Sequence, residues 1–300
     1  MIEQEQTMHM GKLGVWAGLD GMTAASALTF AQRIEKRGYG ALWTPESRGR
    51  NVLVNAAWLL AGTSKLVIAS GIANIYARDA MAMANAQRAL NEQSKDRFLL
   101  GIGVSHKPMV SDVRGHTYGP PVVTMRAYLE AMRASPYQAP PPSEPCRTVL
   151  AALGPKMLAL AAELTDGAHP YCVTPEHTAQ ARRILGPGKL LCPELMVLLE
   201  TDPTKARTAA RTALATYIQL ANYANNWRRL GFTEDDLSGG GSNRFIDANV
   251  AWGDESAIRK RIQSFWDAGA DHVCIQSIHP SGSRTTIDER IFDLLAPSAN

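Results

Sequence analysis

The sequence predicts a (β/α)8 barrel, in which eight parallel strands form a closed ring inside a layer of helices, from three observations. Strand-like apolar runs alternate with helical runs along nearly the whole length of 300 residues. Residues 66–105 contain a strand, a helix and a second strand, a unit that joins parallel strands through a right-handed crossover. The alternation also shows no point at which the strand order would reverse, as the rival doubly wound open sheet requires.

The predicted strands are short apolar runs. Two of them, residues 66–70 and 98–102, are followed by glycine and small residues, which allow the backbone to lie close to a neighbour. At the ends of parallel strands that neighbour is usually a ligand, so the carboxyl ends of the strands are the predicted binding face. The eight strands are expected at residues 13–17, 41–44, 66–70, 98–102, 149–153, 168–173, 194–200 and 271–278.

The segments between the strands carry small and apolar residues at helical spacing, and several begin at residues that favour helix starts. Thr23 and Thr174 are predicted N-caps, Gly38 follows the first helix, and Pro121 and Pro155 stand at two helix starts. The helices are expected at residues 23–36, 51–62, 79–94, 121–134, 155–164, 174–185, 205–230 (as one helix or a broken one), 255–267 and 286–295.

The two long irregular segments are predicted to cover the mouth of a single barrel domain that spans residues 12–300. Residues 105–120 follow the fourth strand, and residues 233–245 contain three consecutive glycines. Irregular segments of this length in a compact domain are typically lids or disordered tips, so both are predicted lids. Residues 1–11 are polar and are expected to form a disordered lead.

Composition and charge narrow the class of protein. The chain is 45% apolar, which is enough for a full core, and its net charge of +3 gives no electrostatic footprint for nucleic acid. No apolar stretch is long enough to span a membrane, and the first residues do not resemble a signal peptide. The four cysteines form no CxxC pair, so buried thiols and a cytoplasmic location are expected.

The residues beyond the strand ends do not suit hydrolysis. The sequence has no HExxH or GxSxG motif, no lysine centred in an apolar strand and no His-x-His on the first strand, so no catalytic metal is expected. What remains at the predicted mouth is glycine, serine, asparagine, tryptophan and histidine. Such a backbone-rich site suits a large planar cofactor that carries its own reactivity.

Several motifs, in order along nearly the whole chain, resemble the bacterial-luciferase-like superfamily, and within it the branch that uses the deazaflavin coenzyme F420. They are ALWTPES at 41–47, IASGIANIYARD at 68–79, DRFLLGIGVSH at 96–106, VLAALGPKMLALAAELTDGAHPY at 149–171, TPEHT at 174–178 and WDAGADHVCIQ at 266–276.

The resemblance implies a luciferase-like (β/α)8 barrel that transfers a hydride between coenzyme F420 and a small organic substrate. Two alternatives remain: an FMN-dependent monooxygenase on the same fold, and a non-catalytic flavin- or deazaflavin-binding protein. Relatives are commonly dimers, and the predicted helices at 51–62 and 79–94 are apolar enough to supply the interface of a homodimer.

The resemblance also implies roles for individual residues. Gly71 and Ile72 match a non-proline cis peptide whose bulge backs the central ring of the cofactor, and Asn74 matches a polar residue near the ring edge. The rest of the implied cofactor site follows the fourth and fifth strands. It comprises Gly103, Val104 and Ser105 along the cofactor's tail, and Leu153 and Gly154, preceded by Ala152, at its phosphate.

The phosphate role also has a physical basis that is independent of the resemblance. A helix that begins at Gly154 and Pro155 leaves backbone N–H groups aimed at an anion, and Lys156 adds a positive charge. An ordinary helix entry is the alternative interpretation. Trp16 and Trp43 either line the ring pocket or fill the barrel.

The end of the second strand departs from the sugar-phosphate dehydrogenases that this branch contains, in which that strand ends in Asp-His. Here the matching residues are Pro45 and Glu46, so the role of the histidine is lost. Glu46 either acts as the acid–base residue or shapes the pocket, and His106 is the other acid–base candidate. His169 and His279 also follow strands and are expected to be structural.

Overall fold

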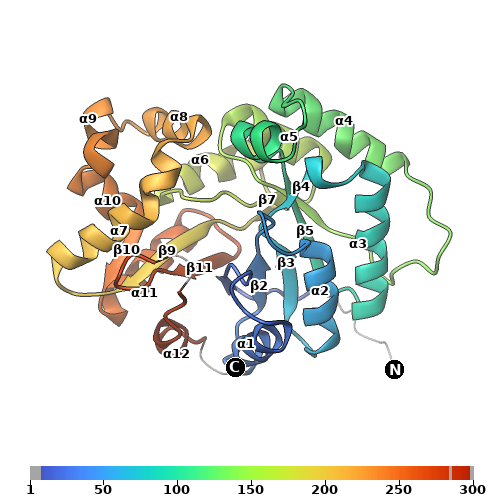
Figure 1. Ribbon diagram of the computed structural model, residues 1–300, viewed down its shortest axis with the longest axis horizontal. Helices are drawn as coiled ribbons and strands as arrows, with labels where there is room; N and C mark the ends of the chain where they lie inside the picture. The colour runs from blue at the N-terminus through green and yellow to red at the C-terminus, as the bar shows by residue number, and fades with distance from the viewer. Residues whose placement is uncertain (1–7, 284–285, 298–300) are drawn as a thin grey trace.

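A computed structural model describes residues 8–283 and 286–297, and it confirms the predicted alternation of strands and helices (Figure 1). The strands are β1 Leu13–Trp16, β2 Ala41–Thr44, β3 Val67–Ser70, β4 Ala73–Asn74, β5 Phe98–Gly103, β6 Thr148–Leu150, β7 Gly167–Ala168, β8 Leu190–Leu191, β9 Glu194–Leu199, β10 Val250–Gly253 and β11 Val273–Ser277. They pair in parallel in the order β10-β9-β11-β1-β2-β3-β5-β6-β7-β8, with β4 beside β5.

The sheet closes into a ring through residues 190–194. Only Cys192 and Pro193 separate β8 from β9. The backbone N–H of Cys192 donates to the carbonyl of Ala168 at 2.9 Å, and that of Glu194 donates to the carbonyl of Pro170 at 2.9 Å. Because β9 pairs with β11 and β11 pairs with β1, these bonds join the two ends of the sheet and form the barrel.

Helices cover the ring, and the two predicted N-caps, Thr23 and Thr174, are confirmed. The side chains of Thr23, Asn51, Asp79 and Thr174 each accept a hydrogen bond from a first-turn N–H group. The helices are α1 Ala24–Lys36, α2 Val52–Ala61, α3 Ala80–Ser94, α4 Pro121–Ala134, α5 Pro155–Leu164, α6 Pro175–Leu185, α7 Pro203–Ile218, α8 Ala221–Arg229, α9 Glu234–Leu237, α10 Asn243–Asn249, α11 Glu255–Asp267 and α12 Arg290–Leu294. Figure 1 shows α7 to α10, gold to orange, on the opposite side of the molecule from α2 to α4.

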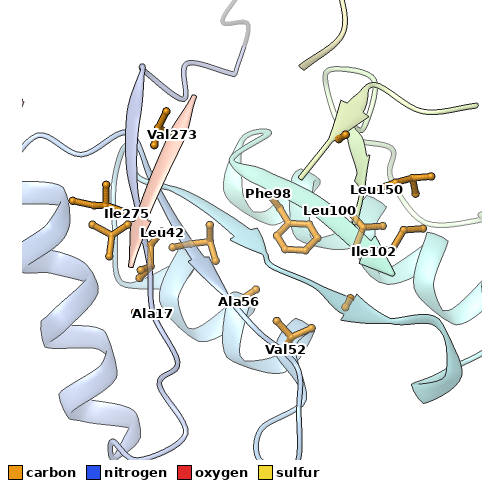
Figure 2. Close-up of a cluster of buried hydrophobic side chains, with 14 of the residues drawn as sticks. Ala17, Leu42, Val52, Ala56, Phe98, Leu100, Ile102, Leu150, Val273 and Ile275 are labelled. Atoms are coloured by element: carbon orange, nitrogen blue, oxygen red, sulfur yellow. The ribbon is translucent and has the colours of Figure 1, made fainter. Parts of the chain in front are cut away.

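Side chains alternate between two clusters along each strand, as the two-residue period of β-structure requires. The outer cluster packs against the helices and includes Leu42, Phe98, Leu100, Ile102, Val273 and Ile275 (Figure 2). The inner cluster lies within the barrel and includes Trp43, Ala69, Leu99, Val149 and Cys274. Because side chains fill the ring, a ligand site has to lie at one of its ends.

Proline shortens or divides two of the predicted strands. The strand predicted at 168–173 ends at Ala168, because Pro170 has no N–H group for a ladder and Cys172 adopts a left-handed backbone with φ of 53°. The strand predicted at 194–200 begins earlier, as β8, and is interrupted at Pro193.

The segment from residue 203 to residue 253 contains more regular structure than predicted. The helical region 205–230 is broken, with α7 and α8 separated at Gln219 and Leu220. The segment 233–245, expected to be irregular, contains α9, a 3-10 turn (η3, Ser238–Gly240) and the start of α10, and Thr233 and Asp236 form a capping box. The strand β10 was not predicted and pairs with β9.

The other predicted lid, residues 105–120, contains one π-helical segment (η2, Pro108–Val113). A lid function for either segment stays a prediction. Residues 1–7 of the predicted lead lie outside the described residues, and the final helix is shorter than predicted. No helix in the described part of the chain is both long and apolar enough to cross a lipid bilayer. Cys172, Cys192 and Cys274 are buried, as predicted, and Cys146 is half-buried.

Candidate functional site

The chain turns away from the sheet where β3 ends, and we call residues 71–74 the bulge. The Gly71–Ile72 peptide bond is cis, as the resemblance implied. The chain then pairs again as β4, which places Asn74 beside Gly103 at the end of β5. From the end of β1, Trp16 Nε1 donates to the carbonyl of Gly71 at 3.1 Å.

Gly103 allows the end of β5 to lie against the bulge. A Cβ atom at this position would lie 2.9 Å from Ile72 Cδ1 and 3.0 Å from Ala151 Cβ, which is closer than packed carbon atoms approach. The N–H of Ala151 donates to the carbonyl of Ile102 at 2.9 Å and so brings Ala152 and the residues after it to the same edge. The predicted residues past β3, β5 and β6 therefore meet at one end of the barrel.

A buried ion pair between Glu46 and Arg78 holds the bulge, and we call it the clamp. Both terminal nitrogens of Arg78 donate to the Glu46 carboxylate, Nη1 to Oε2 at 3.0 Å. The side chains of Arg78 and Glu46 are only 9% and 4% exposed. Glu46 also reaches the bulge twice, because its Oε2 accepts from Asn74 N at 2.8 Å and its backbone N–H donates to Ile72 O at 3.2 Å.

The acid–base role predicted for Glu46 stays a prediction. Its carboxylate oxygens accept hydrogen bonds from Arg78, from Asn74 N and, at 3.4 Å, from Val52 N. Proton transfer to a substrate would require at least one of these contacts to break. Sequence analysis assigned no role to Arg78, although the motif IYARD contains it.

Trp43 lies below the mouth, inside the barrel. Its ring is fully buried and stacks on His169, with centroids 4.3 Å apart and planes at 16°. Its Nε1 donates to His272 Nε2 at 3.1 Å, and His272 Nδ1 donates to the carbonyl of Gly11 at 2.9 Å. The Trp43 ring therefore has no exposed surface in this structure with which it could make the predicted contact to the cofactor ring.

The two histidines beside Trp43 are held in their neutral form. Burial lowers the pKa of His169 to about 4 and that of His272 to about 4, because an imidazolium ion would lose its hydration there. His169 Nδ1 donates to the carbonyl of Cys192 at 2.7 Å, which fixes its ring. The side chains of His169 and His272 both lie inside the barrel, below its mouth, and with Trp43 we call them the barrel floor.

Residues 104–106 lead away from β5 at the mouth, and all three are half-buried. Ser105 has φ of 58°, and its carbonyl accepts a hydrogen bond from the Tyr118 hydroxyl at 3.3 Å. Burial lowers the pKa of His106 below its ordinary value of 6.5, and a hydrogen bond with Asn222 opposes this change. The His106 ring is therefore neutral at pH 7.

The start of α5, Gly154 and the Arg229 side chain form a cationic corner, which we call the anion corner. The first N–H groups of a helix have no partner within it and favour an anion. Arg229, from the end of α8, lies over this helix start: a Cβ atom on Gly154 would be 3.4 Å from its Nη2. His177 Nε2 donates to the carbonyl of Leu153 at 2.8 Å and fixes the preceding peptide. Lys156 is exposed in the same turn.

Five rings form an aromatic wall, which we define as Trp16, Tyr171, Tyr217, Tyr223 and His106. Ring centroids are 5.2 Å apart for Trp16 and Tyr171, 5.2 Å for Tyr171 and Tyr217, 5.1 Å for Tyr217 and Tyr223, and 5.7 Å for Tyr223 and His106. The wall begins at the bulge, where Trp16 binds Gly71, continues to Tyr223 on α8 and ends at His106, which follows β5. Sequence analysis missed Tyr217 and Tyr223, because α7 and α8 lie far along the chain from β1, and it gave no role to Tyr171, although the motif at 149–171 ends with this residue.

A groove of about 850 Å³ lies elsewhere, between α3, α4 and residues 135–146. Its lining includes Gln87, Met132, Thr148 and Asp166. Thr148 begins β6 and Asp166 precedes β7, so the groove opens at the amino ends of the strands, away from the bulge. In residues 8–283 and 286–297, no group of three His, Cys, Asp or Glu side chains is arranged to hold a metal ion.

Comparisons with known proteins identify relatives of the same fold. A family described as luciferase-like monooxygenase matches residues 6–272. A Mycobacterium tuberculosis protein to which coenzyme F420-dependent oxidoreductase activity is attributed is 24% identical, over 88% of this chain and 93% of its own length.

Two solved structures have the same architecture. The coenzyme F420 dependent tetrahydromethanopterin reductase of Methanopyrus kandleri superimposes with a TM-score of 0.76 at 16% identity, covering 96% of this chain and 98% of its own. The oxygenating constituent of 3,6-diketocamphane monooxygenase from Pseudomonas putida, in complex with FMN, gives a TM-score of 0.66 at 12% identity, covering 95% and 96%. At these identities the likeness concerns the fold alone.

Proposed function

The chain belongs to the luciferase-like monooxygenase family, and from this we propose that it is an oxidoreductase that uses coenzyme F420 to exchange a hydride with a small organic substrate. The observation that carries the proposal is the bulge, which the clamp holds at the barrel mouth beside Gly103. The activity attributed to the M. tuberculosis relative favours the deazaflavin over FMN. A bound deazaflavin supplies the hydride chemistry, and the protein supplies position and shielding.

The residues at the mouth fit such a cofactor. Ile72, half-buried on the bulge, offers an apolar surface for a flat ring, and Asn74 lies at the end of that surface. Val104 and Ser105 follow along the next strand end. The anion corner provides backbone N–H groups and a guanidinium for a phosphate.

Of the two acid–base candidates, we favour His106. Its ring is half-buried at the mouth and neutral at pH 7, because burial lowers its pKa. A neutral imidazole can accept or relay a proton without first breaking an ion pair. Glu46, in contrast, is engaged by Arg78.

A binding titration tests the proposed cofactor. The apoprotein should bind oxidised coenzyme F420 more tightly than FMN, measured through the fluorescence of each cofactor.

Arg229→Ala should weaken F420 binding about tenfold, because a charge-assisted contact to phosphate is lost. Arg228→Ala is the matched control, since Arg228 pairs with Glu234 on the surface, and it should leave the affinity unchanged. Equal or tighter binding of FMN would instead support the monooxygenase alternative.

We also propose that two copies associate through α2. This helix carries no charged residue, and Val54 and Trp58, one turn apart on it, are 69% and 47% exposed. Exposed apolar side chains on an uncharged helix are typical of an interface between subunits.

The thiols of Cys146, Cys192 and Cys274 form no disulfide, which favours the reducing cytoplasm as the location of the protein.

Val54→Glu should convert the dimer to a monomer, because each copy would place a carboxylate in the apolar interface. Sedimentation velocity at several protein concentrations measures the change. Val123→Glu is the matched control: Val123 is 67% exposed on α4, away from α2, so this variant should remain dimeric. A parent protein that is monomeric at all concentrations would contradict the proposal.

A further inference from the structure

The side chain of Asn226 carries a buried hydrogen-bond donor that no group of the chain accepts. Asn226 lies on α8 and is only 2% exposed. Its Oδ1 accepts a hydrogen bond from Arg229 Nη2 at 3.3 Å, which identifies the other terminal atom of the amide as the donor Nδ2. Nδ2 is fully buried and has no hydrogen-bond partner among residues 8–283 and 286–297. Because buried polar groups of native proteins are nearly always paired, this atom indicates a partner outside the chain.

Asn226 lies beside the anion corner. Arg229 Nη2, which Asn226 contacts, would be 3.4 Å from a Cβ atom on Gly154 at the start of α5. No side chain accepts from the first N–H groups of this helix. Arg229 forms no ion pair with a carboxylate in the described part of the chain, and partial burial lowers the pKa of its guanidinium. Helix N–H groups, a guanidinium and a buried amide therefore meet at one place and share no carboxylate partner.

Three polar residues on one face of α8 reach the residues around the barrel mouth. Asn222, Asn226 and Arg229 follow one another at intervals of four and three residues, so they share one face of the helix. Asn222 bonds with His106, which follows β5, and Arg229 lies over the start of α5. Trp227 fixes the helix, because it is fully buried and its Nε1 donates to α10 at 2.9 Å. This face of α8 therefore spans the proposed cofactor site from the end of β5 to the anion corner.

We propose that Asn226 recognises the phosphate of the cofactor and that its Nδ2 donates to a phosphate oxygen together with Arg229. The inference rests on the proposed function, because it adds a specific donor to the cofactor site described there. A phosphate has several oxygen acceptors, so it meets the helix N–H groups, the guanidinium and the amide at the same time. Arg229 attracts any anion, whereas the fixed amide of Asn226 selects one that reaches beneath α8. Asn226 thus determines specificity for a phosphate-bearing cofactor.

The experiment measures the preference for a phosphate-bearing cofactor. Dissociation constants of oxidised coenzyme F420 and of its phosphate-free core, 8-hydroxy-5-deazariboflavin, are determined by fluorescence titration, and their ratio is the preference. The parent protein should bind coenzyme F420 at least about tenfold more tightly than the core. Asn226→Asp keeps the shape of the side chain and the acceptor for Arg229 but replaces the donor with an oxygen. It should lower the preference about tenfold and leave binding of the core unchanged.

Asn225→Asp is the matched control, because it makes the same change of charge one residue earlier on α8. Asn225 is exposed and accepts from Arg228 Nη1 at 3.0 Å, three residues along the helix, as Asn226 accepts from Arg229. This variant should keep the parental preference.

Asn226→Leu is the second variant, and it separates a role in binding from a role in folding. Leucine fills a similar space without a buried polar atom, so the free protein should be at least as stable as the parent in urea denaturation, while the preference falls. Asn249→Leu is its control. Asn249 is also 2% exposed, but its side chain accepts from Trp227 and donates to the carbonyl of Phe245 at 2.9 Å, so this variant should lose stability.

A folded Asn226→Asp protein with the parental preference would overturn the inference and assign Asn226 to packing. An equal loss of affinity for coenzyme F420 and for the core would also overturn it, because Asn226 would then support the whole site rather than recognise phosphate. Tighter binding of FMN than of coenzyme F420 would overturn the proposed function instead. The effect of Asn226→Asp on the preference for FMN over riboflavin would then decide the inference.

Discussion

Replacing Arg78 with methionine should destabilise the fold by about 3–5 kcal/mol and abolish cofactor binding, because it leaves the buried Glu46 carboxylate without its cation. Both side chains of the clamp are almost fully buried, at 9% and 4% exposure. Glu46 contacts both Ile72 O and Asn74 N, so a shift of this residue would move the bulge. Urea denaturation measures the stability, and a titration with oxidised coenzyme F420 measures the binding.

An exposed ion pair provides the control for the clamp. Arg126 donates two hydrogen bonds to Glu163, but the two side chains are 40% and 53% exposed. Arg126→Met should therefore change the stability by less than about 1 kcal/mol. Adding Glu46→Gln to Arg78→Met should restore part of the lost stability, since no buried charge remains. An Arg78→Met protein as stable as Arg126→Met would show that the clamp does not hold the site.

Acidification from pH 7 to pH 5 should remove about 3–4 kcal/mol of folding stability through His169 and His272 together. Burial lowers the pKa of each to about 4, whereas an unfolded histidine titrates near 6.5. Between these two values the unfolded chain binds protons that the folded chain does not. Stability is therefore complete above pH 6.5 and falls as the pH drops toward 4.

Urea denaturation at the two pH values tests this dependence. His272→Gln should remove about half of the loss, because glutamine can still accept from Trp43 and donate to Gly11 but cannot be protonated. His279→Gln is the control, since the His279 side chain is half-buried and bonds locally to Ser281, and this variant should lose as much stability as the parent. Burial also lowers the pKa of His106 and of His177, so these two histidines add to the loss of folding stability on acidification. The same pH dependence in His272→Gln as in the parent would refute the account of the barrel floor.

Local signals allowed most of the fold to be predicted. The N-caps Thr23 and Thr174 and the apolar strand runs act over a few residues, so their effects can be read from sequence alone. Two prolines, Pro170 and Pro193, ended or divided strands within apolar runs, because a missing N–H group outweighs hydrophobicity. The short strand β10 has no such signal, since its pairing with β9 depends on a distant segment.

The candidate site was predictable where a motif is continuous and was missed where contacts join distant segments. The bulge at Gly71 and Ile72 was predicted through the resemblance, and the structure has the cis peptide there. The partner of Glu46 is Arg78, and the cation near Gly154 is Arg229, and neither pairing follows from spacing along the chain. The tyrosines of the aromatic wall come together only because α7 and α8 fold back to the mouth.

Transfer of a labelled hydride tests the central claim most directly. The protein is incubated without oxygen with reduced coenzyme F420, deuterated at its hydride-donating carbon, and an excess of each member of a panel of small ketones. The account predicts that the cofactor is oxidised and that deuterium appears at the carbinol carbon of the product, in equal amounts. Oxidation of the cofactor only in a parallel incubation with oxygen, with no deuterium in the product, would contradict the account and favour a monooxygenase. Tight binding of the reduced cofactor, with no oxidation by the panel of ketones, would contradict it in favour of a non-catalytic binding protein.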